Sequence, residues 1–104
     1  MSNYRLSRQA DRDLDGIADY IADFDPTAAL DLLDTLHDTF AFLAKNPEAG
    51  TLREDLRPRL RIFSPGRPAH NYVIFYYPRA DGIEVVSVIH GAQNWADIFR
   101  RGER

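Results

Sequence analysis

The first half of the chain carries apolar residues at the spacing of α-helices. From residue 10 onwards they recur every three or four positions, at Ala10, Leu14, Ile17, Ile21 and Phe24. This pattern predicts an amphipathic helix with Ser7 as its N-cap. The residues before it, 3–6, are predicted to form a short strand.

A second helix is predicted after the Asp25–Pro26 pair, because aspartate favours the N-cap and proline favours the first helical position. Its apolar stripe consists of Ala29, Leu32, Leu33, Leu36, Phe40 and Leu43. Asn46–Pro47 and Gly50 are expected to end it. The link between the two helices is short, so we expect them to form an antiparallel hairpin.

The second half of the chain has the pattern of strands. Residues 51–58 show no regular pattern, whereas residues 59–63 (RLRIF) alternate in polarity. Two segments rich in β-branched and aromatic residues follow, 71–77 (NYVIFYY) and 83–89 (IEVVSVI). The five residues between them predict an antiparallel hairpin. Asn94 is placed to cap a last short helix that carries Trp95, Ile98 and Phe99.

The strand predicted at residues 71–77 is apolar on both faces. One face carries Tyr72, Ile74 and Tyr76, and the other carries Val73, Phe75 and Tyr77. In the next strand, simple alternation opposes Ile83, Val85 and Ile89 to Glu84, Val86 and Val88. A helical hairpin covers only one face of a sheet, so the last helix, a partner chain or water must meet the other. We expect a partner to take part.

Composition changes this picture little. The 104 residues are 44% hydrophobic and 28% charged, which is typical of one globular domain, and we expect a single domain over residues 1–104. There is no apolar run long enough to span a membrane and no signal-peptide pattern at the start. The absence of cysteine excludes disulfides and thiol chemistry and fits a cytoplasmic location.

Charge is distributed unevenly along the chain. Residues 1–50 hold four Lys/Arg and ten Asp/Glu, whereas residues 51–104 hold nine arginines and six Asp/Glu. Arginine binds carboxylates and phosphates with a planar fork, so the second half suggests an anion-binding face, although a solvated surface explains the pattern as well. The acidic helices would repel nucleic acid, so we expect no direct DNA binding by this chain alone.

Several short motifs, in this order, resemble the ParE branch of the RelE/ParE toxin superfamily. They are Tyr4-Arg5-Leu6-Ser7, Ala10, Asp13-Leu14, Ile17 with Tyr20-Ile21, Asn46-Pro47, Leu60-Arg61, Tyr72-Val73-Ile74-Phe75-Tyr76 and Val88-Ile89-His90-Gly91. The resemblance implies an α+β fold: an N-terminal strand, an antiparallel helical hairpin packed on an antiparallel sheet of three main strands, and a short C-terminal helix. It also implies a ParD-type antitoxin as partner.

Two activities occur in this superfamily. RelE-like members cut mRNA and carry an arginine just after the tyrosine that opens the third strand, where this chain has Val73. They also carry basic residues after the fourth strand and a tyrosine near the chain end, which this chain lacks. The resemblance therefore implies a non-catalytic toxin that acts on DNA gyrase. The alternatives are a ribosome-dependent mRNA interferase and an inactive toxin that survives as an antitoxin-binding module.

His90 is the candidate for the alternative nuclease activity, because a histidine at a strand end can act as a general base. His70 or Glu84 would be its partner. The competing interpretation is that His90 only bonds the backbone at the sheet edge. His37 is expected at the surface. No metal-ligand or cofactor motif is present, so we expect neither a metal nor a cofactor.

The candidates for partner binding are Arg59, Arg61, Phe63, Arg67 and Trp95. If Leu60 and Ile62 face the helices, then Arg59, Arg61 and Phe63 lie on the open side of the sheet. There they could meet gyrase, phosphate or an acidic antitoxin. Arg79 and the terminal Arg100, Arg101 and Arg104 could do the same. Trp95 is either a contact anchor or a lid on the core.

Overall fold

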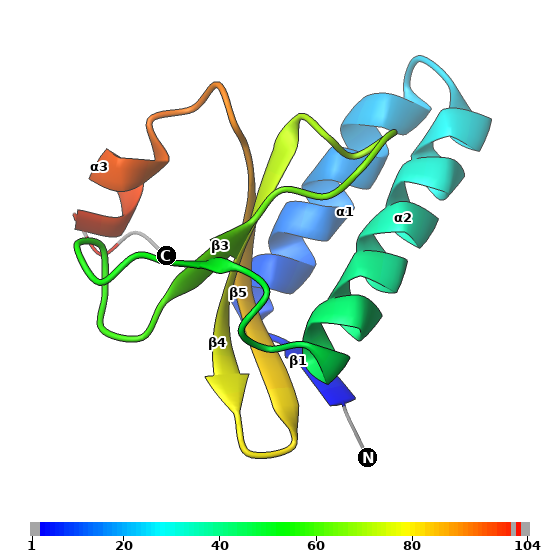
Figure 1. Ribbon diagram of the computed structural model, residues 1–104. Coiled ribbons are helices and arrows are strands. Elements are labelled where there is room, and N and C mark those ends of the chain that lie inside the picture. Colours follow the sequence, from blue (N-terminus) through cyan, green and yellow to red (C-terminus); the bar gives the residue numbers. More distant parts are fainter. Residues whose placement is uncertain (1–2, 101, 103–104) are drawn as a thin grey trace.

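The structure is a computed structural model that describes residues 3–100 and 102, and the backbone alone at Arg100. Its elements are β1 (Asn3–Leu6), α1 (Arg8–Ala22), α2 (Pro26–Lys45), β2 (Thr51–Leu52), β3 (Arg61–Phe63), β4 (Tyr72–Arg79), β5 (Gly82–His90) and α3 (Trp95–Arg100). Helices α1 and α2 lie side by side along one face of the sheet, and α3 lies on the other face (Figure 1). The predicted α+β class is confirmed.

The sheet has five strands in the order β1-β5-β4-β3-β2. Strand β1 runs parallel to β5, and the other neighbours are antiparallel, so the sheet is mixed rather than purely antiparallel. Strand β2 was not predicted, because two residues are too few to show a period. The β4–β5 connection is also tighter than predicted, since β4 extends to Arg79 and β5 begins at Gly82.

The predicted helix starts are confirmed by their caps. The Ser7 hydroxyl accepts a hydrogen bond from the Ala10 N–H at 3.0 Å, and the Asp25 carboxylate accepts from the N–H groups of Thr27 and Ala28. Helix α1 ends at Ala22, however. Phe24 was predicted to continue the apolar stripe of this helix, but it lies beyond the helix end and is 75% exposed. None of the described helices is long and apolar enough to cross a membrane.

The main core lies between the helical hairpin and the sheet. The stripes of α1 and α2 meet the inner faces of β4 and β5 there, and fully buried members include Leu36, Phe40, Ile74, Tyr76 and Val85. The residues that β4 contributes to this core lie on one face of the strand, as alternation predicts. His37, expected at the surface, is half-buried in this region, where its Nδ1 lies 2.9 Å from the Tyr4 hydroxyl oxygen.

A second core covers the opposite face of the sheet. Leu56 and Leu60 from the segment between β2 and β3, and Phe99 from α3, pack on Phe75 and Ile89. The Phe75 and Phe99 ring centroids are 4.6 Å apart. The chain thus shields much of this face itself, with a segment that the sequence pattern left irregular.

This second core corrects the predicted orientation of residues 59–63. Leu60 and Ile62 pack into the second core rather than against the helices. Arg61 and Phe63 pair with Tyr76 and Ile74, so they share the helix side of the sheet with those residues. Leu60 and Ile62 face the side of the sheet where Phe75 and Phe99 form a core. Alternation shows that the two residues share a face, but it does not show which face of the sheet that is.

A bulge in β5 corrects the predicted faces of that strand. The register shifts between Phe75 and Tyr76, which pair with Ser87 and Val85 and leave Val86 as an extra residue. Val88 consequently joins the main core and Ile89 the second core, the reverse of simple alternation.

The outer edge of β5 is closed by side chains from α1 once β1 ends. The Asp13 carboxylate accepts hydrogen bonds from the Val88 N–H at 3.0 Å and the Ser87 hydroxyl at 2.6 Å. The Ser7 hydroxyl donates to the Val86 carbonyl at 2.9 Å. Helix α1 therefore satisfies polar groups of the strand where no neighbouring strand does.

Candidate functional site

An open groove runs between α1, the start of α2, the loop before β4 and the end of β5. Its volume is about 800 Å³. The apolar lining consists of Ile17, Tyr20, Ile21, Ala28, Leu32, Pro68, Tyr72 and Val88, and the polar lining of Arg12, Asp13, Asn71, His90 and Gln93, with Gly16 between them. We call this hollow the α1 groove.

The α1 groove has an aromatic wall. Tyr72 is half-buried, and this burial raises the pKa of its hydroxyl above the ordinary value of 10.0, with a further contribution from the nearby Tyr20. The His90 ring meets the Tyr72 ring edge to face, with centroids 5.3 Å apart. Tyrosines of this kind present an apolar ring and a polar tip, so the wall suits a partner with both characters.

His90 is exposed at the end of β5, and its Nδ1 accepts a hydrogen bond from the Ala92 N–H at 3.1 Å. This is the backbone contact considered above. Glu84 lies six residues away on the same strand, or roughly 20 Å, where its carboxylate pairs with Arg79. His70 is exposed in the loop before β4, and no hydrogen bond joins it to His90 in the described part of the chain. Glu84 is therefore too far from His90 to act as the carboxylate partner that the nuclease hypothesis requires.

The five candidate partner-binding residues are not brought together. Arg59 is exposed and has a positive φ of 66°. Arg61 lies on the helix side, where its guanidinium donates hydrogen bonds to the Gly50 carbonyl at 2.7 Å and the Glu48 carbonyl at 3.3 Å. Arg61 thus secures the loop after α2, a role that the sequence did not indicate.

The other candidates are equally dispersed. Phe63 packs beside Phe42, with centroids 5.9 Å apart. Arg67 is exposed in the loop before β4. Trp95 packs on Phe75 in the second core, so it acts as a lid there. Of the terminal arginines, Arg101 and Arg104 lie outside the described residues, as does the side chain of Arg100.

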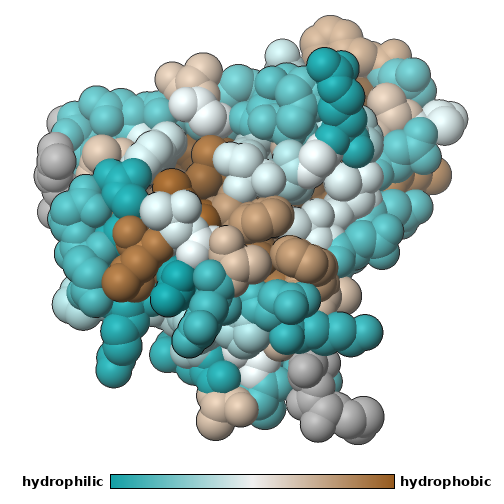
Figure 2. All heavy atoms as spheres, viewed as in Figure 1, coloured by the Kyte–Doolittle hydropathy of each residue, from teal (hydrophilic) through white to brown (hydrophobic). Residues whose placement is uncertain are grey.

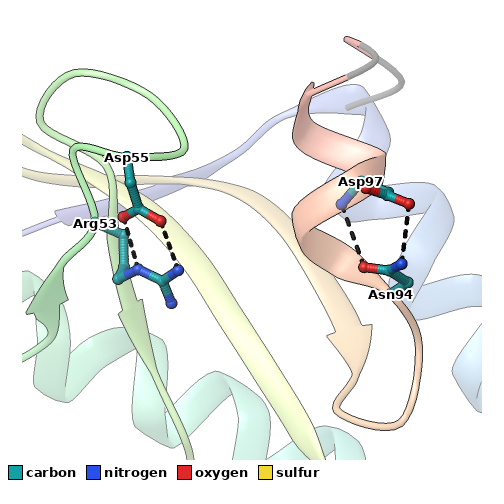
Figure 3. Close-up of polar contacts among 4 residues, drawn as sticks. All are labelled: Arg53, Asp55, Asn94 and Asp97. Carbon is teal, nitrogen blue, oxygen red and sulfur yellow. Dashed lines mark hydrogen bonds and ion pairs between the residues drawn. The ribbon is translucent and has the colours of Figure 1, made fainter.

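Two other arginines flank the second core. The Arg53 guanidinium lies 5.0 Å from the Trp95 ring centroid, and that of Arg57 lies 4.8 Å from the Phe99 centroid. Asp55 binds Arg53 through two hydrogen bonds of 2.8 Å and holds it in place (Figure 3). Across from this pair, Asn94 and Asp97 bond reciprocally at the start of α3, as its predicted cap (Figure 3). The sequence pattern did not indicate the contacts of Arg53 with Trp95 and of Arg57 with Phe99, because they join distant parts of the chain.

The described residues contain no group of three or more acidic, histidine or cysteine side chains placed to hold a metal ion. The α1 groove itself combines an apolar floor with a polar rim.

Comparison with known protein families gives one match over residues 4–95, to the ParE toxin of the type II toxin–antitoxin system parDE. The chain belongs to the ParE toxin family. No curated protein sequence matches it significantly. The family match begins at the second residue of β1, runs through β5 and ends at the first residue of α3.

A solved structure supports the same fold for this ParE family member. The chromosomal ParDE toxin–antitoxin system from P. aeruginosa matches with a TM-score of 0.70 and 21% sequence identity, over 86% of this chain and 96% of the other. Val73, which stands where the resemblance implies an arginine in RelE-like members, packs against the second core in this structure. The side chain of Val73 therefore contributes to packing.

Proposed function

We propose that this ParE family member is the toxin of a type II pair in the cytoplasm and that a ParD-type antitoxin neutralises it by binding in the α1 groove. The observation that carries the proposal is the groove itself: apolar side chains from four segments line a hollow that the chain leaves open. Amphipathic helices bind hollows of this kind through apolar residues on successive turns.

The polar lining favours an acidic partner. Arg12 contributes a guanidinium, and Asn71 and Gln93 contribute amide donors beside the apolar floor. An antitoxin segment with apolar residues on one face and carboxylates on the other would satisfy both parts of the groove.

Gly16 provides a test that leaves the core intact. It lines the groove, and a Cβ built on it meets nothing within 4 Å. The Gly16→Phe variant should therefore fold and fill the groove. We expect it to lose at least about tenfold in affinity for the antitoxin encoded in the neighbouring reading frame, measured by isothermal titration calorimetry.

Asp15→Phe is the matched control, because Asp15 is exposed on the same helix and does not line the groove. It should bind the antitoxin as the wild type does. Equal binding by both variants would place the antitoxin elsewhere.

We further propose that the target is DNA gyrase, inhibited by protein–protein contact without catalysis by this chain. The missing RelE residues support this, as does the engagement of Glu84 with Arg79. An mRNA-cleaving toxin needs groups that deprotonate the 2′-hydroxyl and stabilise the phosphate charge at one place.

The test combines the purified toxin with gyrase and supercoiled plasmid. We expect linear DNA to accumulate after denaturant releases trapped gyrase. Full supercoiling activity in the presence of excess toxin would contradict the proposal. Codon-positioned mRNA cuts in a primer-extension assay that disappear in His90→Ala would establish the mRNA interferase instead.

A further inference from the structure

The connected end of the helical hairpin exposes large apolar side chains. We call residues 19–31, which span the end of α1 and the start of α2, the hairpin tip. Tyr20 is 62% exposed, Phe24 75% and Leu30 64%. The rings of Tyr20 and Phe24 meet edge to face with centroids 5.3 Å apart, so they form one aromatic surface in solvent. Figure 2 shows tan and brown atoms among teal ones at this end of the hairpin.

The helical hairpin as a whole is strongly negative. Residues 13–44 contain eight aspartates and no lysine or arginine. Within the tip, Asp19, Asp23, Asp25 and Asp31 are all exposed. The ion pairs formed among the described residues, Arg53–Asp55 and Arg79–Glu84, lie elsewhere. Asp25 is bonded to backbone N–H groups as the N-cap of α2, so the charge left for water or a partner to neutralise is that of Asp19, Asp23 and Asp31.

Two of these aspartates stand where helix physics disfavours them. Asp19 lies in the last turn of α1 and Asp23 is its C-cap, and this turn contains no basic residue. The C-terminal end of a helix carries partial negative charge, so carboxylates there weaken the helix. A cation from a partner would relieve this repulsion. Fold stability alone does not account for their placement.

We propose that the hairpin tip is the surface by which this toxin binds a positively charged face of its target protein. The inference rests on the proposed function and deepens it. Enzymes that hold DNA carry lysine and arginine on the surfaces that meet phosphates. Such a surface complements the exposed aspartates that cap no helix N-terminus, and the Tyr20–Phe24 pair supplies the apolar contact that aromatic anchors give to interfaces.

The tip adjoins the α1 groove and shares Tyr20, Ile21 and Ala28 with it. Tyr20 belongs to the aromatic surface and also lines the groove. An antitoxin seated in the groove would cover Tyr20 and so reduce the surface open to the target. Neutralisation then follows from occlusion, without a change of the toxin's fold.

The first test replaces the most exposed aromatic ring. Phe24→Ser should bind immobilised gyrase subunits at least about tenfold more weakly than the wild type in biolayer interferometry. Leu52→Ser is the control, because Leu52 is an exposed apolar residue, 45% accessible, in β2 rather than at the tip. It should bind within about twofold of the wild type, and circular dichroism melts should show both variants folded.

The second test uses charge. Asp23→Lys removes a carboxylate from the C-terminal end of α1, so it should raise the thermal midpoint. It should nevertheless weaken gyrase binding, and wild-type binding should weaken as salt increases. Asp15→Lys carries the same charge change in mid-helix, away from the tip, and should have a smaller effect on binding. A merely structural role of Asp23 cannot give opposite signs for stability and binding.

The outcomes separate this inference from the choice of gyrase. If the wild type and Phe24→Ser bind gyrase equally, the tip proposal is wrong and gyrase stands. If the wild type does not bind gyrase, growth arrest in cells without antitoxin tests the tip instead. Loss of arrest in Phe24→Ser would support the tip as the binding surface for another target. Undiminished arrest in Phe24→Ser would overturn the tip proposal. Loss of antitoxin binding alone would assign the tip to the antitoxin, and concentration-dependent self-association abolished by Phe24→Ser would assign it to a second copy. A wild type that neither binds gyrase nor arrests growth contradicts both proposals.

Discussion

The hydroxyl oxygen of Tyr76 accepts a hydrogen bond from the backbone N–H of Gly50 at 2.8 Å. The same hydroxyl donates to the Pro47 carbonyl, also at 2.8 Å. Tyr76 is fully buried in the main core. A single phenol thus fastens the loop after α2 to β4, and Arg61 adds a further bond to the Gly50 carbonyl.

Removing this hydroxyl should destabilise the fold. In Tyr76→Phe the buried Gly50 N–H and the half-buried Pro47 carbonyl lose their partner, which costs about 1–3 kcal/mol of unfolding free energy. Urea denaturation measures the loss. Tyr77→Phe is the matched control on the next residue, which is only half-buried, and should change stability by less than about 0.5 kcal/mol. Equal losses in both variants would contradict this account of the loop.

The same tyrosine should make stability depend on pH in the alkaline range. Burial raises the pKa of Tyr76 above 10.0, although the Gly50 N–H and the Arg61 charge lower it in part. The unfolded chain therefore releases the proton first, and stability is lost as pH rises from the ordinary value towards the raised one. Urea midpoints at about pH 8.5 and about pH 10.5 should differ less in Tyr76→Phe than in the wild type. An unchanged difference would show that Tyr76 does not contribute.

Gly50 and Gly16 should respond to alanine with opposite signs. A Cβ on Gly50 would lie 2.6 Å from the Tyr76 hydroxyl and 2.7 Å from the Ile62 carbonyl, so Gly50→Ala should cost about 1–3 kcal/mol. A Cβ on Gly16 meets nothing, and alanine is the better helix former, so Gly16→Ala should add roughly 0.5–1 kcal/mol. Thermal melts of the two variants check this, and a destabilised Gly16→Ala would contradict the open environment of that site.

Asp13 should be worth more to the fold than its neighbours on α1. Asp13→Ala leaves the Ser87 hydroxyl and the Val88 N–H without their acceptor, at a cost of about 1–3 kcal/mol. Asp15→Ala makes the same change at an exposed position and should stay within about 0.5 kcal/mol of the wild type. Hydrogen exchange at the Val88 amide gives a local measure. Unchanged protection in Asp13→Ala would show that another group holds this edge.

Local signals in the sequence predicted local structure well. The caps at Ser7, Asp25 and Asn94 act within a few residues, and they were correctly assigned. The bulge at Val86 was not predicted. It lies where β5 stops pairing with β1 and begins to contact α1, which a local pattern does not show. The side chosen by Leu60 was missed for a similar reason, since Phe99 lies 39 residues further along the chain.

The candidate site shows the same limit. The α1 groove collects Arg12, Leu32, Tyr72 and His90 from separate elements, and no spacing in the sequence joins them. The family resemblance anticipated a binding protein, but the arginines and aromatics chosen for it lie on both faces of the sheet. Contact residues drawn from distant segments need the topology before they can be chosen.

The bonds that Asp13 and Ser7 make to β5 have a consequence for how this molecule meets extended chains. Beyond the end of β1, the Val88 N–H and the Val86 carbonyl already have hydrogen-bond partners. An extended segment of another chain therefore finds few free backbone groups to pair with along this edge of the sheet. The opposite flank, β2, offers two residues. Both edges of the sheet are thereby protected against the edge-to-edge stacking that leads to insoluble fibres.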